Sequence, residues 1–99
     1  MSVSIRTAIA RMLSILPEGC ELYGIGSFFE GQETFRDVDL VVVTSDSSKP
    51  ARSTKAFRQA AAKTGQELSV TFDITVFTEP EFAAKPLRDM GKLVLLART

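Results

Sequence analysis

Histidine is absent from this 99-residue sequence, and cysteine occurs once, at Cys20. Without histidine the chain has no Ser-His-Asp or Cys-His catalytic group and no imidazole ligand for a metal ion. One cysteine excludes an intrachain disulfide and cannot form a thiolate metal site alone, and it favours a reducing cytoplasm. Hard oxygen ligands, above all carboxylates, are what the sequence offers for metal binding and catalysis.

An excess of charge and a long apolar run are also lacking. Twelve Lys and Arg residues balance twelve Asp and Glu residues, which argues against a general nucleic-acid binder, since such a protein needs a dense basic surface. Arg6 and Arg11 interrupt the apolar N-terminal stretch, so we expect an amphipathic helix there rather than a signal peptide or membrane segment. The length predicts a single soluble domain over residues 1–99, too short for a separate substrate domain.

Apolar periodicity predicts three helices. The first ends before Pro17. Its buried face is expected to comprise Ile5, Ile9, Met12, Leu13 and Leu16. The second is expected from Arg52 to Thr64, with Gly65 as its stop. The third is expected from Pro80 to Met90, bent or restarted at Pro86.

The second predicted helix has a cationic polar face. Its basic residues are Arg52, Lys55, Arg58 and Lys63. Such a face is usually only solvated, but it could also contact a triphosphate or an acceptor. The sequence leaves both readings open.

Four short apolar segments predict strands, and together they predict an α/β (α+β) fold with a small mixed sheet of three to four strands flanked by helices. The segments are Glu21 to Ile25, Asp37 to Val43, Val70 to Phe77 and Leu93 to Ala97. In the third, alternation places Val70, Phe72, Ile74 and Val76 on one face. The opposite face then carries Thr71, Asp73, Thr75 and Phe77.

Aspartates occur in two of the predicted strands. Asp37 and Asp39 project from the same side because strand side chains alternate, and two such anions repel unless cations neutralise them. Asp73 is the outward carboxylate of the later strand, so three carboxylates converge if the two strands pair. That set suits Mg²⁺ or Mn²⁺. The alternatives are a solvated strand end for the pair and an ordinary exposed residue for Asp73.

Gly26 and Ser27 follow the first strand, ahead of an expected turn or short helix. A glycine lets the backbone approach a phosphate, and a serine hydroxyl with nearby N–H groups can bind the phosphate oxygens. Without the carboxylates, the same pair would more often be an ordinary turn. Beside a metal site, it indicates binding of a nucleoside triphosphate. Cys20, Phe28, Phe29 and Phe35 are expected to be packing residues or loop anchors, and the role of Arg36 stays open.

The stretch GIGSFFEGQETFRDVDLVVV resembles the signature of the minimal nucleotidyltransferase domain of the DNA polymerase beta-like superfamily. In that signature Gly-Ser is followed, after about ten residues, by Asp-x-Asp on a strand; here the spacer is nine residues. The family's third carboxylate lies on a later strand, where FDITVF supplies Asp73. The resemblance extends over nearly the whole chain and implies the nucleotidyltransferase fold.

The resemblance also implies a two-metal transfer of a nucleoside monophosphate, with AMP from ATP favoured, to a hydroxyl of a protein or small molecule. Asp37 and Asp39 would coordinate both Mg²⁺ or Mn²⁺ ions, and Asp73 would complete the site of the ion that activates the acceptor. Gly26 and Ser27 would hold the β- and γ-phosphates.

A second interpretation is an interaction module. Small relatives in this family are similar to antitoxins paired with HEPN-type helical ribonucleases, some of which adenylylate the toxin. A DNA or RNA polymerase is disfavoured because no template channel fits this length and charge. Antibiotic-modifying transferases have an additional substrate domain, which a homo-oligomer or hetero-complex would have to supply here.

Overall fold

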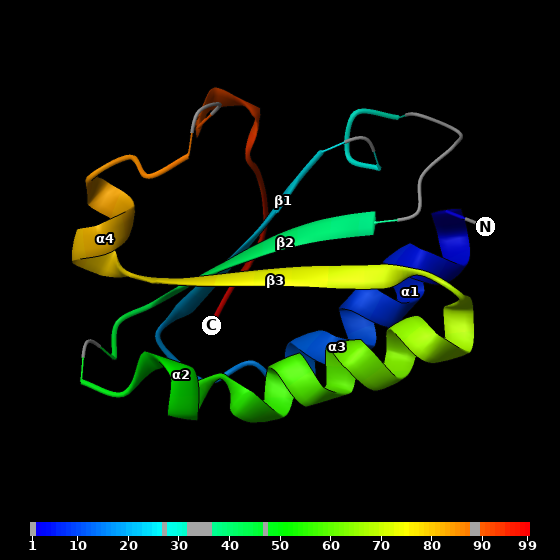
Figure 1. Cartoon of the computed structure of the whole chain (residues 1–99), viewed down its shortest axis with the longest axis horizontal. Helices are drawn as coiled ribbons and strands as arrows, with labels where there is room; N and C mark the ends of the chain where they lie inside the picture. The colour runs from blue at the N-terminus through cyan, green and yellow to red at the C-terminus, as the bar shows by residue number, and fades with distance from the viewer. Residues whose placement is uncertain (1, 27, 32–36, 47, 88–89) are drawn as a thin grey trace.

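A four-stranded mixed sheet organises the chain in this computed structural model, which describes residues 2–26, 28–31, 37–46, 48–87 and 90–99 (Figure 1). The strands are β1 (Cys20–Ile25), β2 (Asp37–Thr44), β3 (Thr71–Thr78) and β4 (Val94–Arg98). Their order in the sheet is β3-β2-β1-β4. β1 runs antiparallel to both β2 and β4, whereas β2 and β3 are parallel.

The two long helices lie side by side on one face of this sheet (Figure 1). The helical elements are α1 (Ser2–Met12), η1 (Leu13–Ile15), α2 (Pro50–Ser53), α3 (Lys55–Leu68), α4 (Glu79–Ala83) and η2 (Met90–Lys92). α2 and α3 form the crossover between β2 and β3, because parallel strands need a long connection that a helix usually supplies. We call the side covered by α1 and α3 the helix face and the other side the open face.

Side-chain alternation separates the core from the open face, as the sequence predicted. The helix face of the sheet and the apolar sides of α1 and α3 form one cluster. Its buried members are Ile5, Ile9, Met12, Leu16, Cys20, Leu22, Phe28, Val38, Leu40, Val42, Phe57, Ala61 and Phe72. Ile74 and Val76 pack against it, so the predicted two faces of β3 are confirmed.

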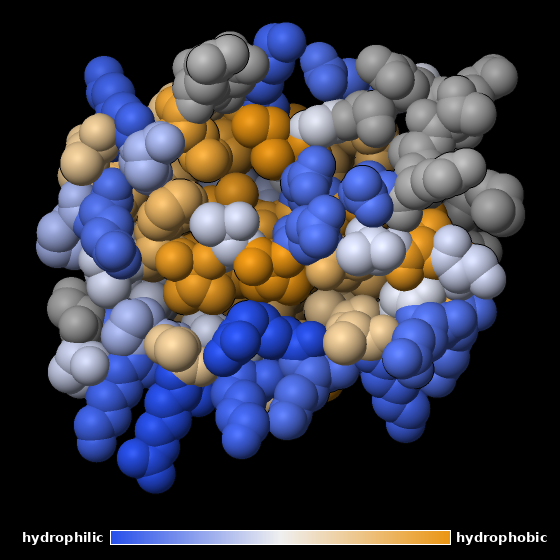
Figure 2. Space-filling model, in the orientation of Figure 1, coloured by the Kyte–Doolittle hydropathy of each residue, from blue (hydrophilic) through white to orange (hydrophobic). Residues whose placement is uncertain are grey.

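A smaller apolar cluster covers one end of the open face. The ring of Phe82 on α4 stacks on Tyr23, with centroids 5.2 Å apart, and lies 6.3 Å from the ring of Phe77. Val41 and Val43 are each only 3% exposed. Apolar side chains also gather across the middle of the molecule in Figure 2. Because α4 directly follows β3, this cluster covers the C-terminal ends of β2 and β3, and it does not extend to their N-terminal ends.

The prediction that Gly65 stops the second helix is wrong. α3 begins at Lys55, after the separate short helix α2, and continues to Leu68. Ser69 then ends it in the left-handed conformation, with φ 57°. Gly65 lies inside the helix where the chain folds back after its end: the Val70 N–H donates to the Gly65 carbonyl at 3.0 Å, and a Cβ on Gly65 would stand 2.6 Å from the carbonyl oxygen of Val70.

The predicted helix from Pro80 to Met90 is confirmed only at its start: residues 84–87 are not helical, residues 88–89 lie outside the described residues, and Met90 begins the separate short helix η2. α4 starts with a capping box, in which the Thr78 N–H donates to Glu81 Oε1 at 2.8 Å, but the helix ends at Ala83. Lys85 has φ 53°, a conformation that a helix cannot continue. The expected C-terminal strand is confirmed as β4. None of the helices in the described ranges is long and apolar enough to cross a membrane.

The close packing at Gly65 leads to a prediction about stability. Gly65→Ala should lower the free energy of unfolding by about 1–2 kcal/mol, because overpacking against Val70 outweighs the better helix propensity of alanine. Gly91→Ala is the matched control, since a Cβ added there would meet no atom within 4 Å; its change should stay within about 1 kcal/mol. Urea unfolding of both variants tests this. Equal midpoints for Gly65→Ala and wild type would contradict it.

Candidate functional site

The parallel register of β2 and β3 brings the three predicted aspartates together. Asp39 pairs with Asp73, and Asp37 pairs with Thr71. All three aspartates alternate with helix-face residues, so all three project from the open face. Neighbouring strands are about 4.8 Å apart, which makes Asp73 the lateral neighbour of Asp39. The strand pairing on which the sequence made this convergence conditional is therefore present, and it places the three carboxylates on one face.

The electrostatics of this group are those of crowded anions. Burial raises the pKa of Asp39 above its ordinary value; the negative charges of Asp73 and Asp37 raise it further, as does a hydrogen bond with Asp73. Asp39 is half-buried, whereas Asp37 and Asp73 are exposed. Within the described ranges, the ion pairs are Lys92–Glu30 and Arg98–Glu21, and neither involves these aspartates. No basic side chain of the described residues therefore neutralises the group through an ion pair.

Gly26 places bare backbone directly beside Asp39. It follows β1 with φ 97°, and a Cβ on it would lie 2.8 Å from Asp39 Oδ2. Its carbonyl accepts the N–H groups of Phe29 and Glu30 at 3.0 and 3.1 Å, so a turn follows, as predicted. Ser27, Phe35 and Arg36 lie outside the described residues. The described half of the Gly-Ser pair therefore borders the carboxylates.

The donor set fits a hard divalent cation that keeps open positions. Across the described residues, no three acidic or thiol side chains are gathered closely enough to enclose a metal ion. Mg²⁺, however, is usually held by one or two carboxylates, with water and substrate phosphates as its other ligands. Carboxylates on two adjacent strands, next to a stretch of bare backbone, provide that chemistry.

Other residues singled out in the sequence lie in the core or on the exposed side of the helices. Cys20 is 2% exposed, and burial raises the pKa of its thiol. Phe28 is buried and Phe29 packs against the core, so the packing role predicted for these three residues is confirmed. The cationic side chains of α2 and α3 are exposed on the helix layer, across the sheet from the aspartates. These are Arg52, Lys55, Arg58 and Lys63.

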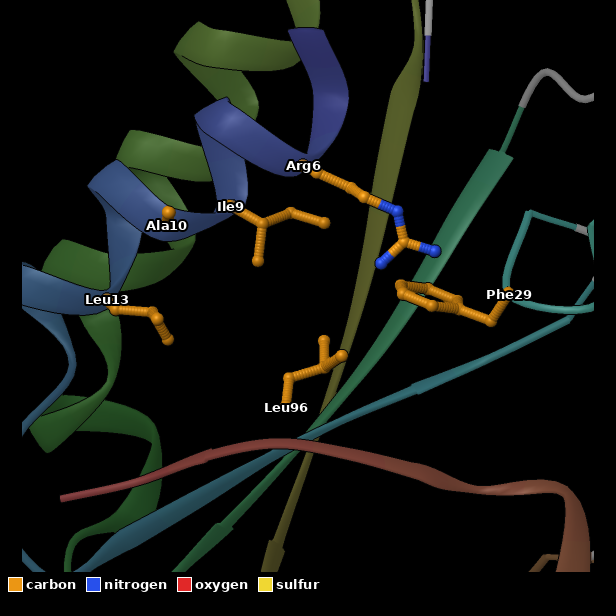
Figure 3. Close-up of a pocket in the computed structure, with 6 residues that line it drawn as sticks. All are labelled: Arg6, Ile9, Ala10, Leu13, Phe29 and Leu96. Atoms are coloured by element: carbon orange, nitrogen blue, oxygen red, sulfur yellow. The ribbon is translucent and has the colours of Figure 1, made fainter. Parts of the chain in front are cut away.

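An apolar hollow on the helix face was not predicted from the sequence. It has a volume of about 170 Å³, and Figure 3 shows the side chains that surround it. They are Arg6, Ile9, Ala10, Leu13, Phe29 and Leu96. The Arg6 guanidinium lies 5.4 Å from the centre of the Phe28 ring. The hollow lies between α1, the turn with Phe29 and β4 (Figure 3), and only the assembled fold brings these segments together. The sheet separates it from the aspartates.

The mixed sheet, its helix layer and the βαβ crossover define an α+β fold of the nucleotidyltransferase type, which confirms the predicted fold class. Among solved structures, a toxin–antitoxin crystal structure with AMP-PNP matches with a TM-score of 0.60 and 16% identity, over 95% of this chain and 73% of that one. A presumed nucleotidyltransferase from Sulfolobus solfataricus matches with a TM-score of 0.53 and 17% identity, over 99% and 80%. No protein-family model matches the sequence, and no curated protein is significantly similar.

Crowding of the carboxylates predicts that Asp39→Asn stabilises the metal-free protein. Folding raises the pKa of Asp39, so ionisation opposes folding. This penalty is absent below the ordinary pKa of 3.8, develops as pH rises through the raised value, and is complete above it. At neutral pH the variant should gain on the order of 1 kcal/mol. Urea unfolding in chelator-containing buffer at several pH values measures the gain, which should vanish in acid.

Asp46→Asn is the matched control for this experiment. The Ser48 hydroxyl, and then the Lys49 N–H, lower the pKa of Asp46 by donating to its carboxylate. Ionised Asp46 therefore stabilises the fold above its ordinary pKa, and this contribution is lost as pH falls. The same chemical change should destabilise the protein here at neutral pH. Shifts of the same sign in both variants would contradict the repulsion at Asp39.

Proposed function

We propose that this protein is a metal-dependent nucleotidyltransferase that transfers a nucleoside monophosphate to a hydroxyl group. The observation that carries the proposal is the pairing of Asp39 with Asp73, with Asp37 on the same face and Gly26 against Asp39. Among the described residues no ion pair compensates these carboxylates, and groups of like charge with a raised pKa, as at Asp39, are concentrated at functional sites. Their match to the Gly-Ser and Asp-x-Asp pattern supports nucleotide transfer as the chemistry of this site.

Each residue has a proposed role. Asp37, Asp39 and Asp73 would hold two Mg²⁺ or Mn²⁺ ions, which supply positive charge to the triphosphate and the leaving group. The backbone of Gly26, with Ser27, would hold the β- and γ-phosphates. Asp73 would accept the proton of the acceptor hydroxyl. The hydroxyl oxygen bonds to the α-phosphorus, the α–β bridging bond breaks, and pyrophosphate leaves.

ATP is the proposed nucleotide donor. The solved toxin–antitoxin structure with a similar fold contains AMP-PNP, an ATP analogue. The favoured product is then an AMP-modified acceptor. The single, buried cysteine agrees with a reducing compartment, and we place the protein in the cytoplasm.

A second candidate function is that of an antitoxin-like partner-binding module, with or without adenylylating activity. The observation in its favour is the toxin–antitoxin assembly among the similar structures. The proposed partner is a small helical protein of the HEPN type. A homo-oligomer is the other arrangement that could complete a substrate site on so small a chain.

Calorimetric titration tests the nucleotide site without knowledge of the acceptor. Wild-type protein should bind ATP more tightly with Mg²⁺ than with EDTA. In the Asp37→Asn, Asp39→Asn double variant this Mg²⁺-dependent gain should disappear, with MgATP affinity falling at least about tenfold. Glu18→Gln with Glu67→Gln is the control, because it removes two charges from exposed positions away from the site. MgATP binding that survives in the aspartate double variant would overturn the proposed site.

Co-expression tests the second function. If the protein is an antitoxin, co-expression with a helical protein encoded beside it should give a complex in gel filtration and relieve growth arrest. A complex that forms equally with the Asp37→Asn, Asp39→Asn variant would separate binding from catalysis. Absence of both complex and protection would contradict the partner-binding function.

A further inference from the structure

β3 is an edge strand of the sheet, and among the described residues no strand pairs with its outer side. It is eight residues long, and its sheet neighbour is β2. In the described part of the chain, no backbone hydrogen bond from a loop or helix involves residues 71–77. Native edge strands are commonly protected by lysine, proline or a bulge, and the β3 sequence TFDITVFT contains no lysine or proline. By contrast, β4 has five residues and a register irregularity opposite Leu22 and Tyr23.

Two hollows flank this edge on the helix face. One, of about 560 Å³, is lined by Ala62, Gly65, Gln66, Ser69, Val70, Thr71 and Phe72. The other, of about 340 Å³, is lined by Pro50, Ala51, Arg58, Ile74, Val76 and Glu81. They involve successive stretches of the same strand, so α3 leaves space beside β3 along much of its length.

Asp73 lies on the opposite face of the same strand. In a strand added to this edge, successive side chains would point alternately to the two faces. Those on the helix face would enter the two hollows, and those on the open face would extend beside Asp73. A residue paired with Asp73 would lie about 5 Å away, comparable to Asp39 on the other side. A short hydroxyl side chain at that position is within reach of the Asp73 carboxylate.

We propose that the acceptor is a serine or threonine in an extended polypeptide segment that docks on the β3 edge as a fifth strand. This inference rests on the proposed transferase function, because Asp73 takes the hydroxyl proton in it. Main-chain pairing supplies affinity, and the hollows select alternate side chains. The serine or threonine oxygen bonds to the α-phosphorus of the nucleoside triphosphate, pyrophosphate leaves, and the proton passes to Asp73 and then to water.

A random decapeptide library displayed on phage provides the probe. Selection uses the intact protein without nucleotide, so that docking is measured independently of transfer. In the selected peptides, residue preferences should alternate from one position to the next. Serine or threonine should recur at one of the positions whose side chains lie on the open face. In a docked strand, every second backbone N–H of the peptide faces β3 and the others face away. Calorimetry with a synthetic selected peptide should show that N-methylation of two amides that face β3 weakens binding about 30-fold, because two hydrogen bonds are lost. N-methylation of two amides that face away from β3 should leave binding nearly unchanged.

Variants of α3 locate the docking site. Ala62→Trp fills the larger hollow and should weaken peptide binding at least about tenfold. Ala56→Trp is the matched control, because Ala56 is exposed on the same helix and is not among the residues lining either hollow. Circular dichroism and urea unfolding verify that both variants fold. Failure to select peptides, or binding indifferent to both N-methylation and Ala62→Trp, would overturn the proposal, as would self-association through β3.

Mass spectrometry after addition of MgATP separates the two proposals. AMP attached to the peptide, and lost when its serine or threonine is replaced by alanine, supports both. Edge docking without transfer would sustain the docking surface but overturn its assignment as an acceptor site. Transfer to a hydroxyl of a peptide that binds elsewhere would leave the nucleotidyltransferase standing and overturn the β3 site.

Discussion

The parallel pairing of β2 with β3 is the constraint on which the site depends. Because strand side chains alternate, a slip of one residue in either strand would turn its aspartates to the helix face. The observed register is held by Val38, Leu40 and Val42 on β2 and by Phe72 on β3, all buried in the core. Burial of these side chains therefore positions Asp39 beside Asp73. Core packing and site geometry have a common cause.

The sequence predicted the strands and the aspartate cluster better than it predicted the helix ends. The apolar run in residues 38–43 and the period-two alternation in residues 70–77 are local signals. With the alternation of side chains in a strand, they gave the correct faces for Asp37, Asp39 and Asp73. The end of α3 was missed because Gly65 leaves room for Val70, which folds back on the helix just after its end, instead of stopping the helix. Strand order and the hollows could not be predicted, since they arise from packing between distant segments.

The open face combines two environments whose energetics differ. Its covered end contains stacked aromatic rings and buried valines, which stabilise the fold by removing apolar surface from water. Its other end concentrates negative charge, and the ionisation of Asp39 there opposes folding until a cation or ligand compensates it. Coupling of ligand binding to folding stability is therefore expected for this end of the sheet.

The division of each strand between its two faces also affects how such a chain can change over evolutionary time. The core takes its residues from the helix face, while Asp37, Asp39 and Asp73 occupy the other face and contribute nothing to core packing. Replacement of these aspartates would thus leave the architecture intact, and relief of repulsion would even assist it. Chains of this shape can lose their chemistry and persist as binding proteins, so shared architecture and shared activity need not be inherited together.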